Sequence, residues 1–282
     1  MSNVSRRPNK EQRTALAQQT LALTARIINT TNATNEADLY STLLPRITPD
    51  PNGTRPRVTV QNSDSFTTAR LILETNPTAK IGVLNMASER HPGGGWLRGA
   101  LAQEEALCFR STLAVTLHKK FYPLPMFGTI WSPNVTVFKD EVDTWFWVYQ
   151  PAEMFTVGVV SLAALRRPLL TPDKRNYGML IAFQAFRWNT NYFKARPQDL
   201  RTVKDKIRQV FRVLAVNGTT HCVMGAMGCG AFQNPPVVVA QCFKDVLEEG
   251  EFNGAFEEII FAVLDSRAEG NFEIFRDALQ AS

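Results

Sequence analysis

Short apolar runs alternate with amphipathic segments along most of the chain. Apolar residues at helical spacing predict helices at residues 10–30, 66–74, 102–118, 198–216, 235–247 and 272–279. Short apolar or alternating runs bounded by turn residues predict strands at residues 57–61, 81–85, 145–149, 156–161, 221–226 and 259–264. A segment rich in Asn, Thr and Pro predicts a loop with a short turn at residues 29–53, and a segment rich in Pro and aromatic residues predicts a surface excursion at 121–143. Residues 166–197 have no clear pattern.

This order of elements indicates an α/β fold. Strands alternate with helices, and most of the strands are apolar throughout, which is typical of a sheet that helices cover on both faces. No repeat and no convincing linker divides the chain. We therefore expect a single three-layer α/β/α domain over residues 56–282, with a helical extension at residues 1–55 packed on it.

Composition limits the cellular compartments and the kinds of site that we expect for this domain. The 282 residues are 44% hydrophobic, enough for a sizeable core, and no apolar run is long enough to span a membrane. The polar N-terminus lacks the apolar region of a signal peptide, so we expect an intracellular protein, nuclear or cytoplasmic. Four cysteines without a CxxC pair and three histidines predict reduced thiols and no metal site.

The net charge of +5 is unevenly distributed. Basic residues outnumber acidic ones from Arg166 to Arg212, whereas acidic residues predominate from Lys244 to the C-terminus. A basic stretch could attract a phosphate-rich ligand, or it could be an ordinary solvated surface.

Two glycine-rich turns each follow a predicted buried strand and precede a predicted helix. The first contains Gly93, Gly94 and Gly95, and the second spans residues 227–234. Ligands of open α/β sheets bind at such turns, where glycines let backbone N–H groups approach an anion. Neither turn fits the dinucleotide-binding or P-loop motif. The two turns could grip a diphosphate from both sides, or they could be simple turn geometry.

A carboxylate pair begins the helix that leaves the first turn. Glu104 and Glu105 follow Gln103, and acidic residues in a first helical turn commonly only offset the helix dipole. A carboxyl held beside a diphosphate and partly buried would instead favour its protonated form, because both effects oppose ionisation. Such a group could serve as a general acid in cleaving a glycosidic bond on a ribose next to a pyrophosphate.

These motifs together resemble the signature of the microbial-type poly(ADP-ribose) glycohydrolases. The first group consists of Asn85–Ala87, Pro92–Gly95, Gln103–Glu105, Cys108 and Arg110–Thr112, and three glycines followed by Gln-Glu-Glu are specific to that family among macrodomains. The second group is Gly225–Pro235, similar to the family's diphosphate and ribose loop, and Phe261–Asp265 resembles its last strand. The likeness runs from about residue 10 to the end and is weakest over 121–198.

The resemblance implies a macrodomain fold with a mixed central sheet, and it implies roles for matched residues. Glu105 matches the catalytic acid/base, and Glu104 matches the carboxylate that orients the neighbouring ribose. The implied substrate-binding residues are Asn85, Gly93, Gly94, Gly95, Gln103, Gly228, Cys229, Gly230, Ala231 and Phe232, with Phe232 packing on the terminal ribose. No cofactor and no metal are implied.

The implied activity is hydrolysis of ribose–ribose O-glycosidic bonds of poly(ADP-ribose), releasing ADP-ribose. Met86 stands where many relatives have Phe, and residues 166–197 are longer and more basic than in compact members. No matched tyrosine clasps an adenine as in animal enzymes, so we expect cleavage mainly from the chain end. We expect a monomer that acts on poly(ADP-ribose) and ADP-ribosylated proteins without a membrane. The alternatives are a non-hydrolytic ADP-ribose reader and a mono-ADP-ribosyl hydrolase.

Overall fold

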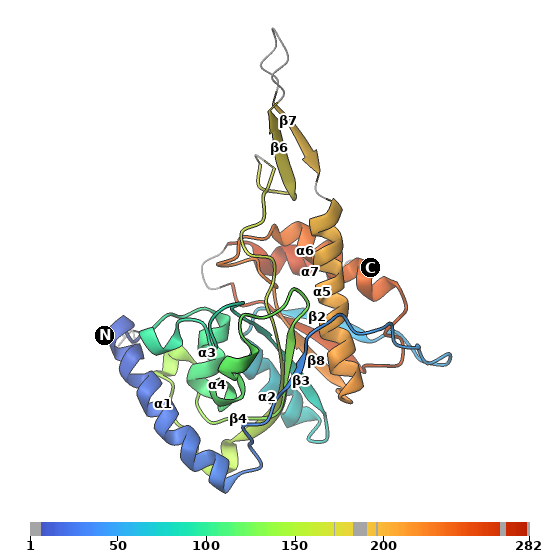
Figure 1. The fold of residues 1–282 in the computed structure, drawn as a ribbon. Coiled ribbons are helices and arrows are strands. Elements are labelled where there is room, and N and C mark those ends of the chain that lie inside the picture. The colour runs from blue at the N-terminus through green and yellow to red at the C-terminus, as the bar shows by residue number, and fades with distance from the viewer. Residues whose placement is uncertain (1–6, 172, 183–190, 196, 266–268, 281–282) are drawn as a thin grey trace, which may run out of the picture.

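A computed structural model describes residues 7–171, 173–182, 191–195, 197–265 and 269–280. A seven-stranded mixed sheet forms the centre of the molecule, with strands in the order β1-β4-β5-β3-β8-β9-β2 (Figure 1). The five strands from β5 to β2 run parallel, while β4 and β1 pair antiparallel at one edge. The expected α/β architecture with a mixed central sheet is confirmed.

Most elements lie where the hydrophobic pattern predicts them. The strands of the central sheet are β1 (Asp38–Tyr40), β2 (Arg57–Gln61), β3 (Ile81–Met86), β4 (Thr129–Val137), β5 (Phe155–Leu162), β8 (His221–Met224) and β9 (Glu258–Ala262). The α-helices are α1 (Lys10–Thr30), α2 (Ser65–Thr75), α3 (Gln103–Arg110), α4 (Leu113–Thr116), α5 (Pro197–Val216), α6 (Pro236–Glu248) and α7 (Asn271–Gln280). A separate hairpin of β6 (Gly178–Ala182) and β7 (Asn191–Ala195) projects from the body (Figure 1).

The sheet has a hydrophobic core on each face because alternate side chains of a strand point to opposite sides. On β3, Leu84 belongs to the core formed with α5, α6 and α7. Val83 belongs to the other core, which contains residues of α1, α2 and α3. The parallel strands β3 and β8 are neighbours, so the loops that leave their carboxyl ends emerge side by side at one edge of the sheet.

Four expectations about local structure are wrong. Residues 121–143 contain the buried strand β4 instead of only a surface excursion. Residues 145–149 form no strand, because Trp145 and Phe146 both adopt left-handed backbone conformations, with φ of 59° and 55°. The region 29–53 contains β1, which pairs with β4, so the N-terminal segment joins the sheet. The helix expected at 102–118 is broken into α3 and α4, because Ser111 and Thr112 leave helical geometry. The domain division at residue 55 stays a prediction.

Helix α1 is joined to the domain through a buried lysine. Lys139 is fully buried, and its Nζ donates to Gln19 Oε1 at 2.9 Å and to Thr20 Oγ1 at 2.8 Å. Thr20 Oγ1 also donates to the carbonyl of Phe109 in α3 at 3.0 Å. Arg13 of α1 donates to the Gly99 carbonyl at 2.8 Å. The helix therefore packs directly behind the segment that carries Gly93–Gly95 and the acidic pair.

No helix in the part of the chain that the structure describes is long and apolar enough to cross a membrane.

Burial lowers the pKa of Lys139 to about 8, from an ordinary value of 10.5. The folded state therefore disfavours the ammonium form, so this lysine destabilises the fold below pH 8, and the penalty disappears as the pH rises to 10.5. We predict that Lys139→Met raises the thermal unfolding midpoint at pH 7 by about 3 °C. The gain should shrink at pH 10, measured by circular dichroism. A variant that is less stable than the parent at pH 7, or a gain of equal size at both pH values, contradicts this prediction.

Candidate active site

Gln103 fixes the start of α3 against the end of β3. Its Oε1 accepts from the Met86 N–H at 2.9 Å, and its Nε2 donates to the Leu84 carbonyl at 2.7 Å. Nε2 also lies 3.2 Å from Ser65 Oγ, to which it donates. The carboxamide therefore pairs with the strand as a neighbouring strand would, and this places the two following glutamates at the sheet edge. Gln103 supports the site through the backbone, and its contact with a substrate stays a prediction.

Two backbone N–H groups hold the Glu105 carboxylate. Oε1 accepts from the Gly95 N–H at 2.8 Å, and Oε2 accepts from the Ala102 N–H at 2.9 Å. The second bond satisfies a donor at the N-terminus of α3, as the glutamate of a capping box does. The first bond ties the glycine turn to the same side chain. Glu105 is only 8% exposed, so it does not face bulk water.

Gly94 has to be glycine because the acidic pair lies against its Cα atom. Its φ is +61°, a conformation that other residues adopt at a cost. A Cβ at this position would lie 2.4 Å from Glu105 Oε1 and 3.0 Å from Glu104 Oε2. The first glycine turn is therefore shaped around the carboxylates.

The N–H groups of the first turn already have internal partners. The Gly95 N–H binds Glu105, the Gly94 N–H donates to the His91 carbonyl at 2.9 Å, and the Gly93 N–H interacts with Glu104. Two of these three amides thus face the protein's own carboxyl groups, Glu105 and Glu104. Contact of this turn with a diphosphate stays a prediction.

Glu104 is buried with one oxygen unsatisfied. Its Oε2 accepts from the Ser88 N–H at 2.8 Å, whereas Oε1 has no hydrogen-bond partner among the described residues. Burial, together with the nearby charge of Glu105, raises the pKa of Glu104 to about 8. At neutral pH this carboxyl therefore holds a proton. The raised pKa is thus found on Glu104, whereas the resemblance gave the acid role to Glu105.

Asn85 lies fully buried at the end of β3, beside this carboxyl. Its Nδ2 donates to Ser161 Oγ at 3.0 Å, and Ser161 is its register partner on β5. Asn85 Oδ1 has no partner within the described chain, and the side chain interacts with Glu104. This interaction lowers the pKa of Glu104, against the larger effect of burial. Asn85 thus belongs to the acidic site, and its contact with a ribose stays a prediction.

Asn234 organises the second glycine turn. Its Nδ2 donates to the Leu165 carbonyl at 2.7 Å and to the Gly228 carbonyl at 3.1 Å, and its Oδ1 accepts from Tyr177 at 2.9 Å. Gly228 has φ of +75°, and a Cβ there would lie 2.5 Å from Asn234 Nδ2. The turn is therefore held in one shape by a buried side chain.

The exposed part of this turn has available donors. Within the described chain, the N–H groups of Gly230, Ala231 and Phe232 donate to no carbonyl or side chain. Such free amides at the carboxyl end of a strand can bind an anion. Phe232 is half-buried beside them, and Cys229 packs against the core, where burial raises the pKa of its thiol. Cys229 is therefore a packing residue of this turn and no nucleophile.

The structure thus brings the predicted residues together in two neighbouring groups. One contains Asn85, Gly93–Gly95 and Gln103–Glu105, and the other contains Gly228–Phe232. The sequence did not mark Ser88, Ala102 and Ser161, which hold the first group in place. All three act through backbone atoms or from another strand, so no local spacing reveals them. Asn234 lies within the second motif, but its sequence position does not show that its side chain shapes the turn.

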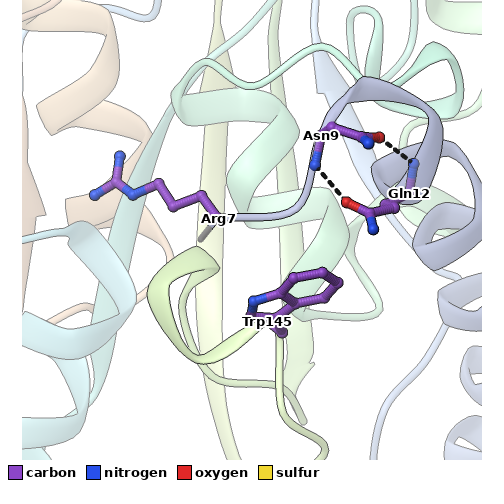
Figure 2. Close-up of a pocket in the computed structure, with 4 residues that line it drawn as sticks. All are labelled: Arg7, Asn9, Gln12 and Trp145. Carbon is purple, nitrogen blue, oxygen red and sulfur yellow. Dashed lines mark hydrogen bonds between the residues drawn. The ribbon is translucent and has the colours of Figure 1, made fainter. Parts of the chain in front are cut away.

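A hollow of about 450 Å³ lies elsewhere, beside the N-terminus of α1 (Figure 2). Arg7, Asn9, Gln12 and Trp145 line it, and Asn9 and Gln12 bond each other's backbone N–H groups at 3.0 and 2.8 Å. Arg7 pairs with Asp143. Because these polar groups already have partners, the hollow offers no acid or base. In the residues that the structure describes, no three His, Cys, Asp or Glu side chains form a group that could hold a metal ion.

The matching family model and three of the matching solved structures all represent poly(ADP-ribose) glycohydrolases. The family model for the microbial-type poly(ADP-ribose) glycohydrolase catalytic domain matches residues 9–140. No curated protein matches the sequence.

Solved structures match over nearly the whole chain. The poly(ADP-ribose) glycohydrolase from Thermomonospora curvata is 25% identical, with a TM-score of 0.76 over 95% of this chain and 100% of its own. The same enzyme bound to the inhibitor ADP-HPD has a TM-score of 0.71 at 25% identity, over 94% of this chain and 98% of its own. The enzyme from Deinococcus radiodurans in complex with ADP-ribose is 32% identical over 81% of this chain and 86% of its own, with a TM-score of 0.63.

Alanine at position 94 tests whether the glycine turn is built around the acidic pair. A left-handed alanine costs about 1 kcal/mol, and overlap with the Glu105 oxygen adds about 2 kcal/mol. Gly218 is the matched control, because its φ is +71° and a Cβ there meets nothing within 4 Å. We predict that Gly94→Ala lowers the free energy of unfolding in urea by more than Gly218→Ala does. Equal losses contradict a turn shaped by the carboxylates.

The raised pKa of Glu104 predicts a pH dependence of stability. A carboxyl with an unfolded pKa of 4.5 and a folded pKa of about 8 stabilises the fold at low pH, and that stabilisation is lost as the pH rises from 4.5 to 8. The unfolding free energy of the parent should therefore fall between pH 5 and 8 by at least about 1 kcal/mol more than that of Glu104→Gln. Urea titrations at both pH values measure the difference. Parallel pH profiles of the two proteins would show that Glu104 titrates normally.

Proposed function

Because the chain belongs to the microbial-type poly(ADP-ribose) glycohydrolases, we propose that Glu105 is the general acid/base with which it cleaves its substrate. It hydrolyses the ribose–ribose O-glycosidic bonds of poly(ADP-ribose) and releases ADP-ribose, mainly from the chain end. The enzyme is a glycosidase. ADP-ribose is bound in the Deinococcus radiodurans relative, and it is the product here.

The observation that carries this proposal is the joint arrangement of Glu104 and Glu105. Two buried, adjacent carboxyls lie at the carboxyl end of β3, and at neutral pH one of them is protonated. Glu104 therefore holds a proton directly beside Glu105, the residue proposed as the acid. A site that binds ADP-ribose without cleaving it does not need a protonated carboxyl.

Catalysis requires a proton on the oxygen that leaves the scissile ribose. Glu105, protonated in the substrate complex, delivers that proton to the leaving oxygen as the glycosidic bond breaks, and positive charge develops on an oxocarbenium-like ribose. The resulting Glu105 carboxylate then takes a proton from the water that attacks the same carbon. The Gly95 and Ala102 amides stabilise this carboxylate, since they donate to its two oxygens. Glu104 orients the neighbouring ribose through its second oxygen.

The second glycine turn receives the terminal ADP-ribose unit. The free amides of Gly230 and Ala231 bind its diphosphate, and Gly228 and Cys229 keep the turn in shape. Phe232 packs on the terminal ribose and fixes its pose over the acidic pair. Gly93–Gly95 close the opposite side, and Asn85 contacts the ribose from the end of β3.

We further propose that the protein acts as a monomer inside the cell, in the nucleus or cytoplasm, on polymers attached to proteins. The cysteines support this setting, because Cys108, Cys222, Cys229 and Cys242 are all unpaired thiols.

Glu105→Gln tests the acid role. The amide keeps the size and one acceptor oxygen but cannot donate a proton to the leaving oxygen at neutral pH. We predict that release of ADP-ribose from labelled poly(ADP-ribose) falls by at least about 10³-fold, while ADP-ribose binding by calorimetry changes little. Products resolved by chain length should be mainly ADP-ribose in the parent.

Glu273→Gln is the matched control, because Glu273 is also the third residue of its helix but is exposed. It should retain full activity. Loss of ADP-ribose binding together with turnover in Glu105→Gln would assign Glu105 to binding instead of proton transfer. Retained binding without any cleavage by the parent would identify a reader, and internal fragments as first products would contradict attack at the chain end.

A further inference from the structure

Two exposed arginines lie against the outer side of the second glycine turn. The guanidinium of Arg166 lies over the ring of Phe232, with its carbon 5.9 Å from the ring centre. The backbone N–H of Arg167 donates to the Phe232 carbonyl at 2.9 Å. The segment that follows β5 is thus joined to the proposed ribose-binding residue by both a side chain and the backbone.

Backbone contacts fix the conformation of the chain at these arginines. Arg167 and Gln233 both have left-handed backbone conformations, with φ of 47° and 58°, on the two sides of that hydrogen bond. Tyr177 on the same segment also donates to Asn234 of the turn at 2.9 Å. Unusual conformations of non-glycine residues persist only where surrounding contacts impose them.

Neither arginine has an acidic partner among the described residues, unlike Arg208 and Arg212 farther along the chain, which pair with Glu249 and Glu251. An unpaired guanidinium can bind a phosphate through two parallel hydrogen bonds. In the proposed complex, the free amides of the second turn already bind the terminal diphosphate. A further cationic pair at its rim therefore fits the next phosphates of a polyanion.

We propose that Arg166 and Arg167 form a subsite for the diphosphate of the ADP-ribose unit adjoining the scissile bond, so that they select polymer over free ADP-ribose. This inference rests on the proposed function for the identity of the polymer.

The test compares two double variants of equal charge change. Arg166→Gln with Arg167→Asn removes the proposed subsite, since asparagine tolerates the left-handed conformation. Lys174→Asn with Arg175→Gln is the matched control on the same segment, because Lys174 also has a positive φ of 57° and Arg175 lies beside Asp173. Both are made with and without Glu105→Gln, which prevents turnover during binding measurements.

Binding of labelled poly(ADP-ribose) is followed by fluorescence anisotropy across salt concentrations, and ADP-ribose binding is measured by calorimetry. We expect the arginine variant to bind polymer about tenfold more weakly, with the slope of log affinity against log salt reduced by about 1.4. Its ADP-ribose affinity should be unchanged, and in the otherwise unaltered enzyme KM for polymer should rise while kcat stays the same.

Three outcomes overturn the proposal: an unchanged polymer affinity, an equal loss in the lysine–arginine control, or an equal loss for ADP-ribose. If the parent enzyme releases no ADP-ribose, the proposed function fails, yet the binding comparison still decides whether the arginines hold polymer. Thermal unfolding of each variant shows whether the fold is intact.

Discussion

The site depends on two hydrogen bonds, which the backbone N–H groups of Gly95 and Ala102 donate to the Glu105 carboxylate. We call this pair of bonds the clamp. Each bond belongs to a different piece of backbone, so one side chain joins the glycine turn to the start of α3. A carboxylate buried without donors would cost several kcal/mol. The two amides make its burial tolerable and fix its orientation. The adjacent glycines are the consequence, since Gly94 leaves space that any side chain would fill.

These two hydrogen bonds also limit how a substrate can reach Glu105. Both Glu105 oxygens accept hydrogen bonds from backbone N–H groups, whereas the proton is on Glu104, whose carboxyl interacts with Asn85. A substrate oxygen can reach Glu105 only by taking the place of one amide. A diphosphate bound beside the pair, as proposed, would add negative charge and favour the protonated form of Glu104. Substrate binding and the protonation of Glu104 would then be coupled by electrostatics.

The rest of the fold holds the clamp steady. Gln103 pins α3 to β3 through strand-like hydrogen bonds, and α1 packs behind the turn through Arg13 and Lys139. On the other side, Asn234 shapes the second turn and leaves its outer amides free. The N–H groups of the first turn thus bind the protein's own carboxyl groups, whereas those of the second turn are free to bind a ligand. The two turns are similar as glycine-rich sequences.

Long periodic segments were predictable from sequence because burial of one face dictates their pattern, as in α5. Strand β4 was not, since a register shift between Ser132 and Val135 interrupts its alternation. Trp145–Tyr149 has strand-forming residues, yet Trp145 and Phe146 are left-handed, which composition cannot reveal.

The acidic pair was recognisable from its motif, but its partners were not. Gly95 and Ala102 act through backbone N–H groups, and Ser161 comes from another strand. Which of the two glutamates carries the proton depends on burial, and burial is defined only by the three-dimensional structure.

The most direct measurement is a crystal structure of Glu105→Gln bound to a dimer of ADP-ribose. The account predicts that the side chain at position 105 releases one of its two amides and lies within hydrogen-bond distance of the glycosidic oxygen. The terminal diphosphate should lie on the amides of Gly230 and Ala231. A complex in which the linkage oxygen contacts only Glu104, or neither carboxyl position, would contradict the account.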